Sequence, residues 1–231
     1  VLLGSLADAG GGALRYVRAA SDLVKQFDEE LGEALEVVAR DVVLQVSCDD
    51  GANVTCLSPF DVQRGADRIE IMLGDLVSRQ ELVVLIEVAV APRGEGDTVG
   101  CCAQVRTAKE QRELPEARAV WTAVSAQRDW ETREASVVSV VVDHIVAATR
   151  ETALEHNLGG DSDAVQRALE QGGSALEALE AEDLTGDARQ ALMEDQVSWS
   201  SPLPSEEAKE VYACSYSLRR SRSEDGSSRR R

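Results

Sequence analysis

The feature that most limits how this chain can fold is a change in its hydrophobic period. Apolar residues recur at helical spacing over residues 22–38, at strand-like spacing in several segments between 40 and 130, and at helical spacing again from about residue 144. Intervals of three and four residues place apolar side chains on one face of a helix, whereas alternation places them on one face of a strand. Because the two patterns occupy separate stretches, the sequence predicts an α+β chain.

The clearest single element is the amphipathic helix predicted at 22–38. Ser21 and Asp22 are typical residues for its N-terminal cap. Before it, residues 1–10 have the pattern of a helix end, Gly10–Gly12 form a C-terminal cap turn, and residues 13–17 have the pattern of a short strand. The chain begins inside an apolar helical pattern, so we expect it to be a fragment, with a processed terminus as the alternative. The predicted apolar face of the helix consists of Leu23, Val24, Phe27, Leu31, Ala34, Leu35 and Val38.

The middle of the chain is predicted to be rich in strands. Asp49–Gly51 is a turn signal between two strand-like segments, 41–47 and 53–57, and it predicts a hairpin. Four or more strands with turns between them indicate an antiparallel sheet or a small sandwich over about 40–130. The further strand candidates are residues 68–73, 81–90, 100–106 and, more weakly, 120–124.

The last third is predicted to be helical. A pattern that starts near 133, with a β-rich and ambiguous beginning, runs to about Leu158, where Gly159 and Gly160 interrupt it. Asp161–Asp163 can cap a second helix, which gives a helical hairpin. The remaining predictions are a weak helix at 186–197, a loop at 198–205 and a short helix at 206–218.

The C-terminal tail differs from the acidic body. Residues 218–231 hold six Arg and two acidic residues, a net charge of +4, and almost no apolar surface, so we expect them to be disordered. The whole chain has 42 acidic and 24 basic residues, a net charge of −18. Such a chain repels phosphate groups, which argues against nucleic acid or an anionic membrane as a partner. No apolar run reaches the length of a membrane span.

The cysteines do not form a recognisable metal motif. The five cysteines include no Cys-x-x-Cys pair, and neither histidine is close to one of them, so zinc is not expected. Cys48 and Cys56 flank the predicted hairpin turn and could form a disulfide in an oxidising compartment. The default expectation is reduced thiols in a cytoplasmic protein, which the odd count of cysteines favours.

No residue is assigned a catalytic, cofactor-binding or metal-binding role. His144 and His156 are separated by twelve positions of one predicted helix, so they point to different faces and have no nucleophilic partner in the sequence. Asn53 begins an Asn-x-Thr sequence, for which chance occurrence is the simplest explanation. Helix capping explains Asp161–Asp163 better than calcium binding does. The chain is therefore predicted not to be an enzyme.

Residues 3–27, Leu-Gly-Ser-Leu-Ala-Asp-Ala-Gly-Gly-Gly-Ala-Leu-Arg-Tyr-Val-Arg-Ala-Ala-Ser-Asp-Leu-Val-Lys-Gln-Phe, resemble the end of a von Willebrand factor type A domain. The resemblance implies that residues 1–38 are the last βα unit of a doubly wound α/β domain. It also implies a β-sandwich-like domain at 40–130 and a helical hairpin region at 133–197. Residues 198–231 would then form a loop, a short helix and a disordered Ser/Arg-rich tail.

The resemblance also carries expectations about function. Type A domains bind Mg²⁺ through an Asp-x-Ser-x-Ser loop, and no such sequence occurs here, so a metal site is expected only in a full-length parent. The implied function is a non-enzymatic protein-interaction or scaffold module in the cytoplasm. The alternative is a subunit of a larger, chelatase-like, ATPase-associated enzyme complex. The expected partners are proteins, including a second copy bound through residues 1–38.

Overall fold

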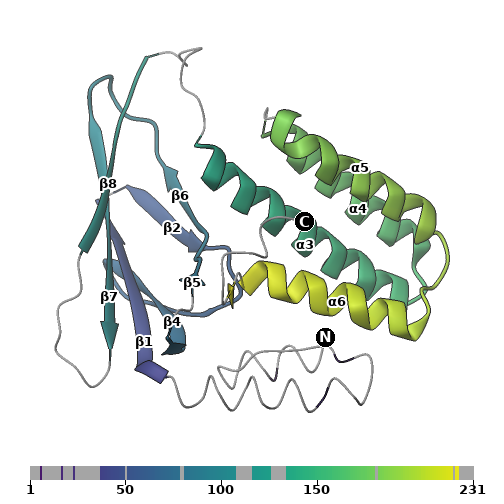
Figure 1. Cartoon of the computed structure of the whole chain (residues 1–231). Coiled ribbons are helices and arrows are strands. Elements are labelled where there is room, and N and C mark those ends of the chain that lie inside the picture. The colour runs from purple at the N-terminus through teal and green to yellow at the C-terminus, as the bar shows by residue number, and fades with distance from the viewer. Residues whose placement is uncertain are drawn as a thin grey trace. The chain divides into compact units, whose positions relative to one another are not determined.

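A computed structural model describes residues 37–49, 51–78, 81–107, 116–125, 134–179, 182–220 and 222–223, together with Leu6, Val17 and Leu23. Its described strands β1 to β8 lie in one compact unit and its described helices α3 to α6 lie in another. The described residues therefore form a mixed α+β structure, as the change in hydrophobic period predicts (Figure 1).

The strand unit is built on a five-stranded sheet in which all neighbours are antiparallel. Its order is β3 (Asp61–Arg64), β4 (Arg68–Val77), β1 (Val37–Cys48), β7 (Thr98–Thr107) and β8 (Glu116–Thr122). The long strand β1 is central and pairs with both β4 and β7 (Figure 1). Strand β8 is at one edge of this sheet.

A smaller sheet completes the core of this unit. β2 (Ala52–Cys56) pairs with β6 (Ile86–Val90). The strand unit also contains the short strand β5 (Glu81–Leu82), and a further short strand, β9 (Arg222–Ser223), lies at the end of the described chain. Alternate residues of β1 and β4 point to the same side, where they meet Val54 of β2 and Phe60. The buried members of this cluster are Val42, Val46, Val54, Phe60, Ile69, Ile71 and Leu73.

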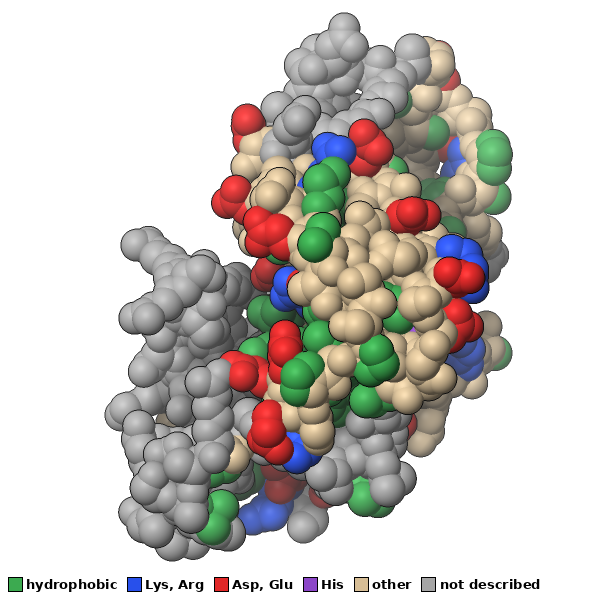
Figure 2. Space-filling model, turned by 90° about the vertical axis from the view of Figure 1, so that its right-hand side faces the viewer, with side chains coloured by type: hydrophobic (Ala, Val, Ile, Leu, Met, Phe, Trp, Pro, Cys, Tyr) green, Lys and Arg blue, Asp and Glu red, His purple; other side chains and the backbone are tan. Residues whose placement is uncertain are grey.

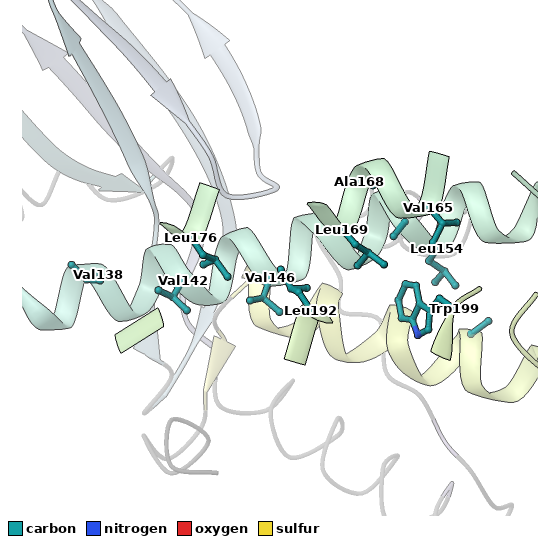
Figure 3. Packing of buried hydrophobic residues seen from close by; sticks show 12 residues of the cluster. Val138, Val142, Val146, Leu154, Val165, Ala168, Leu169, Leu176, Leu192 and Trp199 are labelled. Atoms are coloured by element: carbon teal, nitrogen blue, oxygen red, sulfur yellow. The ribbon is translucent and has the colours of Figure 1, made fainter. Parts of the chain in front are cut away.

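The helical unit contains α3 (Ala135–Leu158), α4 (Ser162–Glu177), α5 (Glu182–Ser198) and α6 (Ser205–Arg220). The side chain of Asp161 caps α4 by accepting a hydrogen bond from the Ala164 backbone N–H at 2.9 Å, which confirms the predicted cap. Aliphatic residues of the helices form one core that runs along α3, with Trp199 near Leu154 towards one end of it (Figure 3). The buried amide of Asn157 ties α3 to the α5–α6 connection, because it donates to Ser201 O and accepts from Leu203 N.

The predicted hairpin between residues 41–47 and 53–57 is wrong. The turn itself forms, with Gly51 at φ 85° and Ala52 N donating to Asp49 O. However, β1 already has β4 and β7 as its two neighbours, so β2 leaves the large sheet and pairs with β6. The turn therefore connects two sheets instead of two paired strands.

Several predicted boundaries also need correction. The helix predicted at 22–38 does not include its last two residues, because β1 begins at Val37. The single strand predicted at 81–90 is divided into β5 and β6, and β3 was not predicted. Arg219 and Arg220, predicted to be disordered, belong to α6, where Arg219 forms an ion pair with Glu151.

The remaining predictions for the two ends fall mainly outside the described residues. Leu6 and Leu23 are helical, as predicted, whereas Val17 lies outside any helix or strand. Gly10–Gly12 and residues 224–231 are not among the described residues. Within the described chain, no helix has the length and apolar character needed to cross a membrane.

Candidate functional site

The face of the five-stranded sheet that points away from the core carries a row of polar side chains. Each strand contributes one residue, and the pairing registers place these residues opposite one another across the sheet. A row of long polar side chains at this position leaves the face unsuited to packing in a hydrophobic core. The row consists of Gln63, Glu70, Gln45, Gln104 and Glu116.

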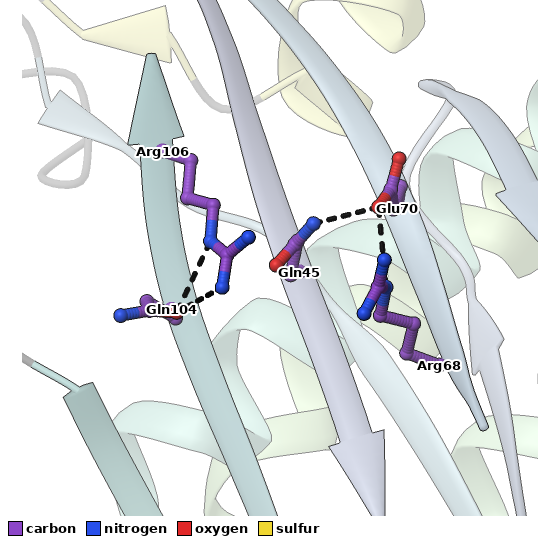
Figure 4. A network of polar contacts seen from close by, with 5 residues as sticks. All are labelled: Gln45, Arg68, Glu70, Gln104 and Arg106. Atoms are coloured by element: carbon purple, nitrogen blue, oxygen red, sulfur yellow. Dashed lines mark hydrogen bonds and ion pairs between the residues drawn. The ribbon is translucent and has the colours of Figure 1, made fainter. Parts of the chain in front are cut away.

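Two separate groups of hydrogen bonds hold side chains of this row (Figure 4). Gln45 Nε2 donates to Glu70 Oε1 at 2.6 Å, and Arg68 Nε donates to the same oxygen at 3.2 Å. Gln104 Oε1 accepts from both Nε and Nη2 of Arg106, at 3.2 and 2.9 Å. These bonds hold the side chains of Gln45, Glu70 and Gln104 in place on the sheet surface.

Strand β8 differs from the rest of the sheet because all seven of its residues are exposed. Its apolar residues include Val120, 57% exposed, and Trp121, 47% exposed. Trp121 pairs with Val99, which is only 3% exposed, so the indole lies on the side of the sheet that forms the core elsewhere. Within the described residues, the core-side face of the sheet is therefore only partly covered at β8.

The hydrogen bonds next to β8 show which of its backbone groups point away from β7. Ala123 N donates to Asp97 O at 2.7 Å, and Ala123 O accepts from Gly96 N at 2.9 Å, so the polar backbone groups of Ala123 point towards β7. Along a strand, the backbone N–H and C=O groups of successive residues point alternately towards one neighbouring strand and away from it. The backbone N–H and C=O groups of Glu116, Arg118, Val120 and Thr122 therefore point outward.

Arg118 is the basic residue of β8, and its side chain leans inward across β7. A Cβ atom at Gly100 would lie 3.4 Å from Arg118 Nη2 and 3.1 Å from Asp49 Oδ2. Gly100 N in turn donates to Asp49 Oδ2 at 2.6 Å. The guanidinium thus lies over the sheet near Asp49 and not along the outer edge of β8.

The cysteines are arranged differently from the prediction. Cys48 forms a disulfide with Cys101, its direct opposite in the β1–β7 register, and not with Cys56. The expectation of reduced thiols is therefore wrong for these two residues, whereas Cys56, Cys102 and Cys214 are free. A hydrogen bond to Glu116 raises the pKa of the Cys102 thiol, and burial raises the pKa of Cys56. Thiols with raised pKa values are poor nucleophiles at neutral pH.

The two histidines lie on α3, His144 half-buried and His156 exposed. Burial lowers the pKa of His144, and the positive charge of Arg219 lowers it further. The unfolded chain therefore binds a proton more readily at this site than the folded chain does. The contribution of neutral His144 to the folding stability is fully present above the ordinary histidine pKa of about 6.5. It decreases as the pH falls through that value.

We expect the His144→Gln variant to lose less stability than the unmodified chain when the pH falls from about 7.5 to about 5.5, because Gln cannot take up the unfavourable proton. The measurement is the free energy of unfolding from the helical circular dichroism signal at both pH values. The unmodified chain, measured in parallel, is the reference. Equal pH dependence in the His144 variant would contradict the assignment.

Other polar groups of the strand unit surround an open hollow of about 360 Å³ at the β3–β4 turn. It holds charges of both signs, from Arg64, Asp67 and Arg68, and Arg64 Nη1 donates to Val54 O at 3.1 Å. No group of three or more metal-ligating side chains is found among the described residues. On the face seen in Figure 2, acidic side chains are scattered among basic and hydrophobic ones. Asn53, the first residue of the Asn-x-Thr sequence, is exposed on β2.

The sequence detected residues 120–124 only as a weak strand. It could not show that this strand lies at an edge, because strand order depends on contacts far apart in the chain. The alternation of Ala119 and Trp121 with Arg118 and Val120 was the available signal, and it does not distinguish an edge strand from a central one.

No protein-family model matches the chain, and neither does any curated protein. Among solved structures, the chain is similar to one described as von Willebrand factor type A from Catenulispora acidiphila. The TM-score is 0.63 at 16% sequence identity, over 92% of this chain and 54% of that chain. The chain thus spans about half the length of the structure it matches. At this level of identity the similarity concerns the fold, so the chain shares a fold with part of a von Willebrand factor type A protein.

Proposed function

We propose that this chain is a non-enzymatic protein-interaction module whose binding site is the outer edge of β8. The observation that carries the proposal is a fully exposed edge strand that presents Val120 and Trp121 together with outward backbone groups. An edge strand can add an extended segment of another protein through main-chain hydrogen bonds. Tryptophan is also among the residues that contribute most to binding at protein interfaces.

The chemistry of the site agrees with binding better than with catalysis. Main-chain hydrogen bonds supply affinity in strand addition, and alternate side chains supply specificity. On β8 these side chains are Arg118 and Val120 on the polar face, and Ala119 and Trp121 on the core face. An extended segment with an apolar residue facing Ala119 would cover the indole and complete that end of the core face.

The similarity to a von Willebrand factor type A protein supports a place for this module in a larger protein. We propose that the chain is the rear portion of such a protein and that any metal-dependent site lies outside it. The predicted cytoplasmic location stays an expectation. The Cys48–Cys101 disulfide weighs against it, because disulfides persist mainly in oxidising compartments.

Site-specific photocrosslinking in cells tests the proposal. Trp121 is replaced by the photoreactive residue benzoylphenylalanine, which keeps an aromatic side chain at the edge. We expect discrete protein adducts after irradiation, identified by mass spectrometry, because a bound strand would lie within reach of this side chain.

The matched control places the same photoreactive residue at Val197, which is 79% exposed on α5. It should give no adduct, or only the diffuse background expected of any exposed site. If the adducts at the two positions are the same, or if position 121 gives none, the β8 edge is not a binding site.

A further inference from the structure

A hollow on the helical unit lies between α3, α5 and α6 and has a volume of about 320 Å³. We propose that it binds a lysine side chain from a basic segment of another protein. This site goes beyond the proposed function, because it lies in the helical unit and uses none of the residues of β8.

Two helices supply most of the lining. Each contributes side chains about one turn apart, which is the spacing that places them on one face of a helix. These residues are Val142, Asp143 and Val146 of α3, and Leu184, Asp187 and Ala188 of α5.

The hollow has an apolar floor and apolar sides. Val142 and Val146 are buried members of the helical core, and Ala188 packs against the same core. Leu184 and Leu218 also line the hollow, but they are 43% and 39% exposed, so part of each side chain meets solvent. Such a surface suits the four-carbon stem of a lysine, which packs against apolar groups while its head group stays in a polar place.

The charge around this apolar surface is negative. Asp143 and Asp187 line the hollow from two different helices, and none of the described residues that line it is basic. Arg219 follows Leu218 in the chain, but it forms an ion pair with Glu151. An ammonium group is a compact charge with three N–H donors, so it can meet carboxylates that approach from different directions.

The charge of the surrounding surface also favours a basic partner. Residues 134–220 hold 17 acidic and six basic residues, a net charge of −11. A field of this sign attracts cationic segments and repels anionic ones. The basic segment therefore has electrostatic contacts beyond the hollow itself.

The openness of the hollow distinguishes a side chain of a protein from a free amine. Sites for small molecules enclose most of the ligand surface, whereas this hollow is open to solvent. A lysine that belongs to a larger partner needs no such enclosure, because the neighbouring residues of the partner can cover the opening. The exposed parts of Leu184 and Leu218 would then contact apolar residues beside the lysine.

Nuclear magnetic resonance of methyl groups in the purified full chain tests the proposal with the peptide acetyl-Leu-Lys-Leu-amide. We expect the methyl signals of Val142, Leu184 and Leu218 to shift and to saturate at about millimolar peptide, because so small a contact binds weakly. The comparison peptide has norleucine in place of lysine, which keeps the stem and removes the charge. It should bind about tenfold more weakly, since it offers no cation to the two carboxylates.

Asp187→Asn removes one of the two carboxylates at an exposed position. It should weaken binding of the lysine peptide about threefold and leave binding of the norleucine peptide unchanged. The matched control is Asp163→Asn, which removes the same charge from the first turn of α4, outside the hollow, and should change neither affinity. Circular dichroism of both variants should match that of the unmodified chain.

Four results would overturn the proposal. They are shifts that do not saturate, shifts that lie away from the hollow, equal binding of the two peptides, and equal effects of the two aspartate variants. Butylammonium provides the last comparison, because it has the lysine stem and charge without the peptide. If it binds as tightly as the lysine peptide, the hollow takes free amines and the proposed protein partner is wrong. None of these results affects the photocrosslinking test of β8.

Discussion

Removing the Cys48–Cys101 disulfide should cost the strand unit about 4 kcal/mol of unfolding free energy. The two cysteines are separated by 53 positions, and a cross-link that closes a loop of this length strongly restricts the unfolded chain. The double variant Cys48→Ala with Cys101→Ala removes the bond without leaving a lone thiol. Hydrogen exchange of amides in β1 and β7 measures the loss, because these strands report on the strand unit alone.

Two controls separate the cross-link from side-chain effects. Adding a reducing agent to the unmodified chain should lower protection in β1 and β7 to the level of the double variant. Cys214→Ala, which removes an exposed free cysteine of α6, should leave exchange unchanged. A loss below about 1 kcal/mol in the double variant would show that the bond contributes little to stability.

Gly172→Ala should destabilise the helical unit, although Ala is the better helix former. A Cβ atom at position 172 would lie 2.5 Å from Cγ2 and 2.9 Å from Cβ of the buried Thr149 on α3, and closer still to its Oγ1. Because the Thr149 side chain is short and branched, it cannot rotate away from this Cβ atom. The helices α3 and α4 must therefore move apart. Overpacking of this kind costs about 1–3 kcal/mol, which exceeds the gain of about 1 kcal/mol from helix propensity.

The neighbouring glycine provides the matched control. A Cβ atom at Gly173 would meet nothing within 4 Å, so Gly173→Ala should stabilise the helical unit by up to about 1 kcal/mol. Chemical unfolding followed by helical circular dichroism compares the two variants. Adding Thr149→Ala to Gly172→Ala should recover part of the loss. If both glycine variants stabilise the protein, the contact between α3 and α4 has room for a Cβ atom at position 172, and the prediction is wrong.

The helices were the easiest elements to predict, because their signals are local. Asp161 caps α4 through a hydrogen bond to an amide only three residues away. Gly159 and Gly160 follow the end of α3, as the sequence predicts. Such contacts depend on neighbouring residues, so a single sequence contains the information needed to place them.

The pairing of strands was predicted less well, because it depends on residues far apart. Cys48 and Cys56 are close in sequence, yet Cys48 binds Cys101, since β7 and not β2 lies beside β1. The run at 81–90 has the composition of one strand, but the structure divides it into β5 and β6. Helix α6 continues to Arg220, in a segment whose composition indicated disorder, and Arg219 forms an ion pair there with Glu151 on α3.

By itself, the sequence determined that a strand-rich middle segment precedes the helices of the last third, where α3 and α4 lie, and that the sequence carries no recognisable metal or catalytic motif. These conclusions follow from hydrophobic period, capping residues and residue spacing, which are properties of short segments. The tertiary structure alone decided the strand order, the partner of Cys48 and the position of β8 at an edge. Edge status is a consequence of which strands pair. An exposed Trp121 therefore becomes a candidate binding residue only once the sheet has formed.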